Sequence, residues 1–323
     1  MAKAIRYHRQ GGPEVLQLDE IQVGEPGPGQ VRVRHTAIGV NFVDTYQRSG
    51  LYPMQLPAVA GNEAAGVVEA VGPQVKDLKK GDRVAYTGLP GSYCDVRIAP
   101  ADRMVKIPQG ISDEQAASMM LKGLTVHYLI FTTYPVKKGE TVLWHAAAGG
   151  VGSIACQWLK ALGVTTIGTV GSDEKAALAK AHGATHVINY SKENFVERVK
   201  AIAGDKKLPV VYDAVGKTTW EGSLDCLRPR GLIVSFGNAS GPVPPVNLGI
   251  LSTKGSLYAT RPTLATHIAS RADLVERSKA LFEIVKSGKV KIETTKKYKL
   301  ADAAQAHRDL EGRKTTGSVV LIP

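Results

Sequence analysis

From residue 141 onward, short apolar segments alternate with segments whose apolar positions follow a helical period. The expected strands are residues 141–144, 165–170, 186–189, 210–213, 231–236 and 255–258. The expected helices between them are residues 153–162, 174–181, 195–203 and 218–227. Strands and helices that alternate at this spacing are typical of a parallel, doubly wound α/β sheet. We therefore expect one α/β domain over residues 123–260.

The first 120 residues have a different pattern, in which apolar and polar positions alternate over short stretches broken by glycine and proline. The expected strands here are residues 31–38, 64–71, 83–86 and 93–98. This pattern predicts a mainly antiparallel, barrel-like β domain over residues 1–122. After residue 261 the chain carries one helical pattern, 274–285, and two strand-like ends, 292–298 and 318–322. We expect residues 261–323 to return to the first domain, and the cleft between the domains to be the reaction site.

A run of small residues follows the first expected strand of the α/β domain and precedes its first helix. Its members are Ala147, Gly149, Gly150, Val151 and Gly152, with alanine at the first of the three usual glycine positions. Strand, glycine turn and helix in this order indicate a dinucleotide site in a Rossmann-type domain. Gly149 allows the backbone to approach a pyrophosphate, and the helix N-terminus offers free N–H groups to it.

The end of the second expected strand indicates which dinucleotide binds. An NAD site usually has a carboxylate about 20 residues past the glycines, bonded to the ribose 2′-hydroxyl. This chain has Val170 followed by Gly171 there, so no carboxylate repels a 2′-phosphate. Ser172, Lys175 and Tyr190 are candidates to bind that phosphate. The sequence therefore favours NADPH, although Asp173 and Glu174 place negative charge nearby and Lys175 also fits an ordinary exposed lysine.

Composition narrows the class of protein further. The chain has 323 residues, of which 43% are hydrophobic, and no segment is apolar enough to span a bilayer. Its N-terminus lacks the apolar core of a signal peptide. The three cysteines, Cys94, Cys156 and Cys226, lie far apart, which is typical of a reducing compartment. We therefore expect a cytoplasmic protein.

The formal net charge of +12 raises the question of nucleic-acid binding. Lysines cluster at residues 76–80, 206–207 and 286–299. These clusters have no interleaved aromatic residues and belong to no recognisable nucleic-acid fold. A solvated basic surface that attracts an anionic cofactor explains the charge better. We expect no nucleic-acid partner.

Several motifs in order along the chain resemble the medium-chain dehydrogenases/reductases, and among them the zinc-independent quinone oxidoreductases related to ζ-crystallin. One signature matches at every fixed position: Gly139-Glu140, Leu143, Ala147-Ala148-Gly149-Gly150, Gly152, Gln157 and Lys160. Further matches lie at residues 11–16, 39–44, 61–63, 66, 81–84 and 235–238. The resemblance covers nearly the whole chain. It implies a Rossmann domain joined to a GroES-like, mainly antiparallel β-barrel catalytic domain.

The chain departs from the zinc-dependent branch of that superfamily at two ligand positions. Asn41 stands where those enzymes have cysteine, and Asn62 where they have histidine. Catalytic zinc needs three protein ligands drawn from thiolate, imidazole and carboxylate. We expect no metal here. Without a Lewis acid, substrates that accept hydride readily fit better than simple alcohols, which leaves quinones and conjugated enones. Both one-electron and two-electron reduction of a quinone stay open.

The resemblance also implies roles for particular residues. It places the loop 41–46 beside the nicotinamide, so that Asn41 and Asp44 would bond the cofactor and Tyr46 and Tyr52 would line the substrate pocket. Packing at a domain edge would explain these tyrosines equally well. Arg261 would reach the pyrophosphate or a substrate oxygen.

Further cofactor contacts are expected at the carboxyl ends of the later strands, where open parallel sheets bind ligands. Gly216, Phe236 and Asn238 lie there, and Asn238 is a candidate for the nicotinamide amide. Arg313, near the C-terminus, is a candidate to close over the adenosine half.

Three hypotheses for the function follow. An NADPH-dependent quinone reductase is the first. A reductase of conjugated enones or alkenals is the second, because it needs the same cofactor geometry and a different pocket. The third is a nucleotide- or RNA-binding protein with vestigial catalysis, against which the glycine turn counts. By resemblance, we also expect a homodimer that pairs through the fifth or sixth strand of the Rossmann sheet, 231–236 or 255–258.

Overall fold

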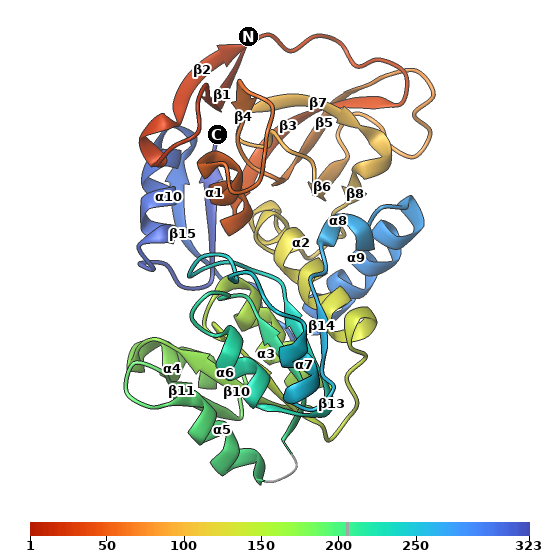
Figure 1. Cartoon of the computed structure of the whole chain (residues 1–323). Coiled ribbons are helices and arrows are strands. Elements are labelled where there is room, and N and C mark those ends of the chain that lie inside the picture. Colours follow the sequence, from red (N-terminus) through yellow and green to blue (C-terminus); the bar gives the residue numbers. More distant parts are fainter. Residues whose placement is uncertain (205–206) are drawn as a thin grey trace. The chain divides into compact units, whose positions relative to one another are not determined.

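The computed structural model describes residues 1–204 and 207–323, which form two compact units (Figure 1). The first unit comprises Met1–Leu124, Ile268–Lys286 and Ile292–Pro323. The second unit comprises Thr125–His267 and Ser287–Lys291. The division falls inside helix α2 (Asp113–Tyr128), which begins with a reciprocal cap: the Ser112 hydroxyl accepts from the Gln115 backbone N–H at 3.1 Å, and the Gln115 side chain accepts from the Ser112 N–H at 3.0 Å. Lys206, one of the clustered lysines, lies outside the described residues.

The second unit is built on one six-stranded parallel sheet with the order β11-β10-β9-β12-β13-β14. Its strands are β9 (Thr141–Trp144), β10 (Thr165–Val170), β11 (His186–Asn189), β12 (Leu208–Asp213), β13 (Leu227–Ser235) and β14 (Tyr258–Thr260). The chain runs outward from β9 in one direction and then, from β12, in the other. This is the strand order of a dinucleotide-binding Rossmann sheet, and it confirms the predicted doubly wound α/β fold. The switch point between β9 and β12 is where such sheets bind ligands.

Helices connect these strands, and the buried side chains between helices and sheet form the core. The helices are α3 (Gly150–Ala161), α4 (Asp173–Ala181), α5 (Phe195–Ala203), α6 (Trp220–Asp225), α7 (Gly249–Thr253) and α8 (Leu264–His267), with a π-helical turn at Leu129–Thr133 after α2. α3 and α4 contact β10, and α6 contacts β12 and β13. Fully buried Leu143, Ile167 and Val211 show that the expected apolar runs are the interior strands.

Two expectations for this sheet need correction. The last strand begins at Tyr258, not at residue 255, because Gly255 has a φ of +114° and Ser256 a φ of +54°. These values belong to a turn after α7, closed by hydrogen bonds from the Gly255 and Leu257 N–H groups to Ser252 and Leu251. In addition, β13 pairs with β12 and β14 on its two sides. Of the two strands expected to meet a second copy, only β14 lies at the sheet edge.

The first unit contains two sheets. β1 (Ala2–Tyr7) pairs with β2 (Gln17–Ile21) and with β4 (Ala58–Val59). The larger sheet has the order β15-β16-β3-β5-β6-β8, with β7 also paired to β3. Its strands are β3 (Gln30–Val40), β5 (Glu63–Val71), β6 (Arg83–Thr87), β7 (Val96–Pro100), β8 (Val105–Lys106), β15 (Thr294–Lys299) and β16 (Ser318–Ile322). All its neighbours are antiparallel except β15 and β16, so the predicted mainly antiparallel domain is confirmed. Closure into a barrel stays a prediction.

The helices of the first unit bring distant parts of the chain together. They are α1 (Phe42–Ser49), the start of α2, α9 (Arg271–Lys286) and α10 (Ala303–Glu311), with short 3₁₀ turns at Pro13–Val15, Ala101–Arg103 and Leu300–Asp302. α10 contacts α1, which places the C-terminal segment beside the loop expected to carry site residues. Of the helices in residues 1–204 and 207–323, none has the length and apolar composition needed to cross a bilayer.

Candidate active site

The glycine turn after β9 has the shape that the sequence predicts for a phosphate cradle. Gly149 is the N-cap of α3, and Ala146 before it has a φ of +55°, which turns its carbonyl oxygen toward the helix start. A Cβ on Gly152 would lie 2.4 Å from that oxygen, and a Cβ on Gly149 would lie 3.2 Å from it. Only glycine fits at Gly152 without displacing the backbone. The first N–H groups of α3 have no partner within the helix and are available to an anion.

The alanine at the first position of the motif is accommodated by the neighbouring strand. Ala147 is fully buried, and a Cβ on Gly168 of β10 would lie 2.6 Å from the Ala147 Cβ. Gly168 therefore makes room for the side chain that Ala147 adds to the motif. The sequence alone does not single out Gly168, because its contact with Ala147 depends on the pairing of β10 with β9.

The predicted 2′-phosphate residues come together at the end of β10. The Ser172 hydroxyl caps α4 by accepting from the Lys175 N–H at 3.3 Å. A Cβ on Gly171 would lie 2.7 Å from the Tyr190 hydroxyl, so this hydroxyl lies directly over Gly171. Tyr190 is 39% exposed, which leaves part of its ring open to a ligand.

The negative charge of Asp173, which argued against NADPH, has partners in the structure. Its carboxylate accepts hydrogen bonds from the Asn189 side chain at 2.8 Å and from the Lys192 ammonium. These two donors lower the pKa of Asp173, with Lys192 the larger cause. Lys192 thus adds a second cation to the end of β10. It was missed because it lies 19 positions from Asp173, on the far side of β11.

The residues predicted at the ends of the later strands also lie together. Gly216 has a φ of +88°, and a Cβ there would lie 2.7 Å from the Gly241 carbonyl oxygen. Arg261 Nη1 donates to the Ser235 hydroxyl at 3.1 Å and to the Gly237 carbonyl at 3.0 Å. Arg261 is thereby held beside the segment 236–238, which contains Phe236 and Asn238.

A buried polar network behind Gly216 was not predicted. Asp213 Oδ1 accepts from the N–H groups of Val215 and Gly216 at 2.8 and 3.0 Å, which fixes the turn after β12. Its other oxygen accepts from Ser223 at 3.0 Å, and Ser223 in turn lies 3.0 Å from His145 Nε2. Burial lowers the pKa of His145. The polar atoms of Asp213, Ser223 and His145 named here contact one another or the backbone of the turn. We therefore interpret this Asp–Ser–His group as holding the turn and not as binding a substrate.

In the first unit, the predicted residues of the loop 41–46 gather at the start of α1. Asp44 is 1% exposed, and its Oδ2 accepts from the Asn41 backbone N–H at 2.8 Å. The rings of Tyr46 and Tyr52 meet edge to face with centroids 5.3 Å apart, and the Tyr52 N–H donates to the Tyr46 carbonyl at 3.0 Å. The two tyrosines are therefore one aromatic pair, set by a short loop.

Asn41 and Asp44 belong to a larger buried cluster that the sequence did not predict. Asn41 Nδ2 donates to Glu63 Oε2 at 2.9 Å, and Lys122 Nζ lies 3.8 Å from the same oxygen. Glu63 and Lys122 are 0% and 6% exposed. Burial raises the pKa of Glu63, while Lys122 and the hydrogen bonds from Asn41 and Leu121 act in the opposite direction. A polar cluster of this kind, closed off from water, is common beside reacting groups.

Arg313 lies in the first unit, in the turn after α10. Its φ is +57°, and its N–H donates to the Leu310 carbonyl at 3.1 Å. The predicted site residues therefore fall into two sets. Asn41, Asp44, Tyr46, Tyr52 and Arg313 belong to the first unit, and all the others belong to the second.

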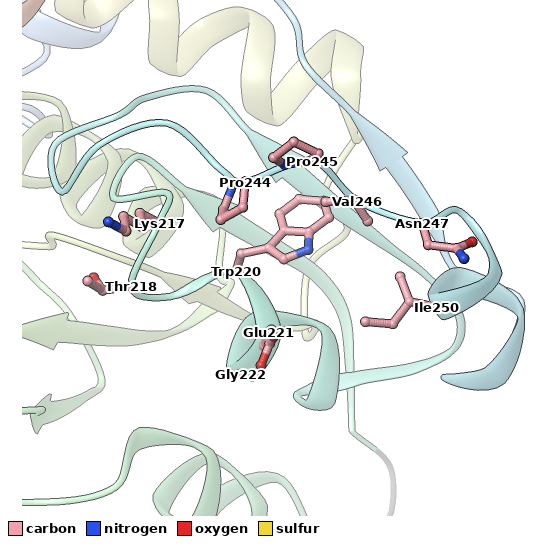
Figure 2. Close-up of a pocket in the computed structure, with 10 residues that line it drawn as sticks. All are labelled: Lys217, Thr218, Trp220, Glu221, Gly222, Pro244, Pro245, Val246, Asn247 and Ile250. Atoms are coloured by element: carbon pink, nitrogen blue, oxygen red, sulfur yellow. The ribbon is translucent and has the colours of Figure 1, made fainter.

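A pocket of about 300 Å³ lies in the second unit, between the start of α6 and the loop before α7 (Figure 2). It is lined by Lys217, Thr218, Trp220, Glu221, Gly222, Pro244, Pro245, Val246, Asn247 and Ile250. None of the predicted site residues lines it. Lys217 and Thr218 directly follow Gly216, so the pocket adjoins the turn after β12.

Two family models match the chain: Zinc-binding dehydrogenase over residues 150–281 and Alcohol dehydrogenase GroES-like domain over residues 27–109. A quinone oxidoreductase of Pseudomonas aeruginosa is 57% identical over 325 residues, which cover 100% of both chains. The chain belongs to the quinone oxidoreductase family of the medium-chain dehydrogenases/reductases.

Two other members of this family are informative. The crystal structure of Escherichia coli quinone oxidoreductase complexed with NADPH matches with a TM-score of 0.98 at 54% identity and covers 100% of both chains. A 2-haloacrylate reductase from a Burkholderia species is 47% identical over 332 residues, which cover 100% of this chain and 99% of the relative. The family thus includes relatives named for quinones and a relative named for a conjugated acid.

The name of the first family model raises the question of zinc. At the two ligand positions, Asn41 donates to Glu63, and Asn62 Nδ2 donates to Asp44 Oδ1 and to Gln47 Oε1, both at 2.7 Å. The side-chain amide nitrogens of Asn41 and Asn62 therefore donate to carboxylates, and the Lys122 ammonium lies 3.8 Å from Glu63 Oε2. Such a donor set does not fit zinc. In residues 1–204 and 207–323, no group of three or more His, Cys, Asp or Glu is placed to hold a metal ion.

Proposed function

We propose that this chain is an NADPH-dependent quinone oxidoreductase. The observation that carries the proposal is its full-length likeness, with a TM-score of 0.98, to a quinone oxidoreductase complexed with NADPH. The residues of the second unit fit such a cofactor, because a glycine turn opens α3 and because Gly171 and Ser172, not a carboxylate, directly follow β10. The balanced reaction takes a hydride from NADPH and a proton from solution, and gives hydroquinone and NADP⁺.

The second unit supplies the cofactor site in this proposal. The turn of Ala147, Gly149, Gly150, Val151 and Gly152 holds the pyrophosphate through backbone N–H groups. Gly171, Ser172, Lys175 and Tyr190 hold the 2′-phosphate, and Gly216, Phe236, Asn238 and Arg261 contact the nicotinamide half. From the first unit, Arg313 is proposed to cover the adenosine half. NADPH, when bound, supplies the hydride.

The first unit supplies the groups that orient the nicotinamide and the substrate. Asn41 and Asp44 bond the cofactor, and Tyr46 and Tyr52 line the pocket, with a phenol placed to donate to a substrate oxygen. Arg261 is the second candidate to contact that oxygen. If Tyr46 or Tyr52 is the donor, its replacement by phenylalanine lowers kcat by about a hundredfold. Unchanged turnover removes that tyrosine from a catalytic role.

We propose that no metal takes part. The support is the donor set at Asn41 and Asn62, whose amide nitrogens are committed to carboxylate oxygens. Quinones suit such a site, since their reduction makes an aromatic ring and needs no Lewis acid to stabilise an alkoxide.

Reduction of conjugated acids or enones is a second candidate. The 47% identity to a 2-haloacrylate reductase favours it. The direct test follows NADPH oxidation by chelator-treated enzyme with a small quinone, a conjugated enone and 2-chloroacrylate in parallel. Turnover with the quinone alone supports the first proposal. Turnover with the enone or the acid alone replaces it by the second, and turnover with none of them contradicts both.

The remaining features of the proposal concern the whole chain. Residues 123–260 are the NADPH-binding domain, and residues 1–122 with 261–323 are the catalytic domain. The enzyme is cytoplasmic, as its three free, buried cysteines suggest. It forms a homodimer through β14, whose Tyr258 is 60% exposed at the sheet edge. A monomer in sedimentation equilibrium contradicts the dimer.

Nucleic acid is not proposed as a partner. Two lysines of the cluster at 286–299 form ion pairs within the first unit, Lys296 with Asp309 at 2.6 Å and Lys297 with Glu114 at 2.7 Å. Ion-paired lysines offer less charge to a phosphate backbone. RNA binding that survives moderate ionic strength would contradict this.

A further inference from the structure

A chain of buried hydrogen bonds begins and ends on α1 and passes through His307 of α10. Arg48 Nη1 lies 2.9 Å from His307 Nδ1, and His307 Nε2 lies 3.0 Å from the Tyr93 hydroxyl. The Tyr93 hydroxyl donates to Asp44 Oδ2 at 3.0 Å. These four side chains are at most 2% exposed, so no water competes for the bonds.

The chemistry of arginine fixes the direction of every bond in this chain. A guanidinium only donates, so His307 Nδ1 must accept from Arg48. Since burial and the Arg48 charge lower the pKa of His307 to about 3, its ring is neutral and carries its single proton on Nε2. That N–H donates to the Tyr93 oxygen, and the Tyr93 proton is then directed to Asp44.

Hydrogen bonds to two other segments hold the Arg48 guanidinium in place, so it fixes one end of this chain of hydrogen bonds. Its Nη1 and Nη2 donate to the two Glu311 oxygens at 3.1 and 2.7 Å, and its Nε donates to the Gly11 carbonyl at 3.1 Å. A bidentate pair with a carboxylate restricts the guanidinium plane. The position of His307 is thus set from two elements, α1 and α10.

The chain ends on a carboxylate that organises the start of α1. Asp44 accepts from Tyr93, from the Asn62 side chain at 2.7 Å and from the Asn41 backbone N–H at 2.8 Å. All three partners donate, so the arrangement suits the ionised form of Asp44. The contact to the N–H of Asn41, the helix N-cap, fixes the point where the loop enters α1.

We propose that His307 and Tyr93 are positioning residues for the reduction proposed above: His307 orients the Tyr93 hydroxyl onto ionised Asp44, and Asp44 holds the start of helix α1, which has Asn41 at its N-cap and carries Tyr46. This inference rests on the proposed function. It assigns a role in the reaction to residues that lie outside the glycine motif and that touch neither cofactor nor substrate in the proposal.

The pH dependence of the reaction follows from this arrangement. Burial raises the pKa of Asp44 to about 6, while hydrogen bonds from Asn62, Asn41 and Tyr93 and the charge of Lys122 lower it. The other charged or titratable groups that act on this cluster are Glu63, Tyr7 and Arg48. Because the ionised form is the active one, kcat falls as the pH drops through the pKa of Asp44. Loss of the Tyr93 bond raises that pKa and moves the acid limb to higher pH.

Tyr93→Phe removes the hydroxyl, and Tyr86→Phe is its matched control. Tyr86 is equally buried, and its hydroxyl lies 2.9 Å from His35 Nε2 in the same unit, with no contact to Asp44. We expect the acid limb of kcat to move up by about one pH unit in Tyr93→Phe and to stay in place in Tyr86→Phe. If the acid limb of kcat lies at the same pH in both variants, the proposal is overturned.

Two variants of His307 separate its accepting atom from its donating atom. His307→Gln places an N–H near the Nε2 position and keeps a donor to Tyr93, whereas His307→Asn places an acceptor near the Nδ1 position and loses that donor. We expect His307→Asn to shift the acid limb as Tyr93→Phe does, and His307→Gln to keep it near the wild-type pH. An acid limb of kcat at the same pH in His307→Asn and His307→Gln counts against the proposal.

NMR measurements, made on the unaltered chain for His307 and on the two tyrosine variants for Asp44, do not depend on quinone turnover, and the His307 measurement needs no variant that could fail to fold. The ¹⁵N shifts of His307 should show a protonated Nε2 and a bare Nδ1 from pH 5 to 9. The ¹³C shift of the Asp44 carboxyl should titrate at higher pH in Tyr93→Phe than in Tyr86→Phe. A protonated Nδ1, or equal titrations of Asp44, overturns the inference even if no quinone is reduced. If the NMR results are as expected but no quinone is reduced, the proposed function is contradicted and the inference about His307 and Tyr93 stands.

Discussion

At the scale of single residues, we expect the preference for NADPH to depend on the charges gathered around Gly171. Lys175 begins the first turn of α4 beside the Ser172 cap, and Lys192 neutralises Asp173 on the same side. A 2′-phosphate carries enough negative charge to repay the ordering of a lysine side chain, whereas a 2′-hydroxyl does not. Lys175 should therefore matter for one dinucleotide and not for the other.

Replacing Lys175 by alanine should lower kcat/KM for NADPH by about tenfold, because a charge-assisted hydrogen bond to the phosphate is lost. The value for NADH should hardly change. Lys180→Ala, an exposed lysine in the last turn of the same helix, is the control for net charge. Equal losses for NADPH and NADH in Lys175→Ala would show that the residue does not read the 2′-phosphate.

The sequence predicts some of the candidate site residues and misses others. The glycine turn and the residues after β10 were found because they lie close together along the chain and follow a strand. Lys192, Glu63, Lys122, Tyr93 and His307 were missed, since each meets its partner only after distant segments fold together. His307, for example, lies 214 positions from Tyr93. Nothing local in the sequence distinguishes such a histidine from a solvated one.

At the scale of elements, the junction of β9 and α3 depends on close backbone contact at Gly152. Gly152→Ala would place a Cβ 2.4 Å from the Ala146 oxygen, so the helix start must move away from the phosphate site. We expect a loss of about 1–3 kcal/mol in the free energy of unfolding and a large rise in the KM for NADPH. Thermal unfolding and steady-state kinetics measure the two effects.

Gly24→Ala is the control for this substitution, because a Cβ on Gly24 meets nothing within 4 Å. Gly24→Ala should leave the free energy of unfolding and the KM for NADPH unchanged. If Gly152→Ala binds NADPH as tightly as Gly24→Ala does, the junction is not the pyrophosphate site.

Elements were predicted best where apolar runs repeat with a βα period. The strands at 141–144, 165–170 and 186–189 occur as expected, and β9 and β10 are interior strands of the sheet, whereas β11 lies at its edge. β14 was misplaced, since the positive φ values at Gly255 and Ser256 turn a segment that reads as a strand. The expected strand at 93–98 begins at Val96, because the Tyr93 N–H bonds to the Ala60 carbonyl outside the larger sheet.

At the scale of the whole molecule, we propose that the two units divide the work of one reaction. The second unit carries the glycine turn and the phosphate residues, and the first unit carries the buried cluster around Asp44 and the tyrosine pair. Two different hydrophobic patterns in the sequence predicted two domains of different fold, and the division of roles between them stays a prediction. The sequence could not predict that α10 packs against α1, whose first residues, 42–46, form a helix and not a loop, because that contact joins segments near the two ends of the chain.

The most direct test of the central claim compares NADPH with NADH on metal-depleted enzyme, with one small quinone as the acceptor. Specificity constants measured before and after treatment with a chelator would show both the cofactor preference and any need for a metal. We predict rapid turnover, at least about tenfold higher kcat/KM with NADPH, and no change on metal removal or on adding zinc back. Equal constants for the two dinucleotides, or activity that disappears with the metal and returns with zinc, would contradict the account.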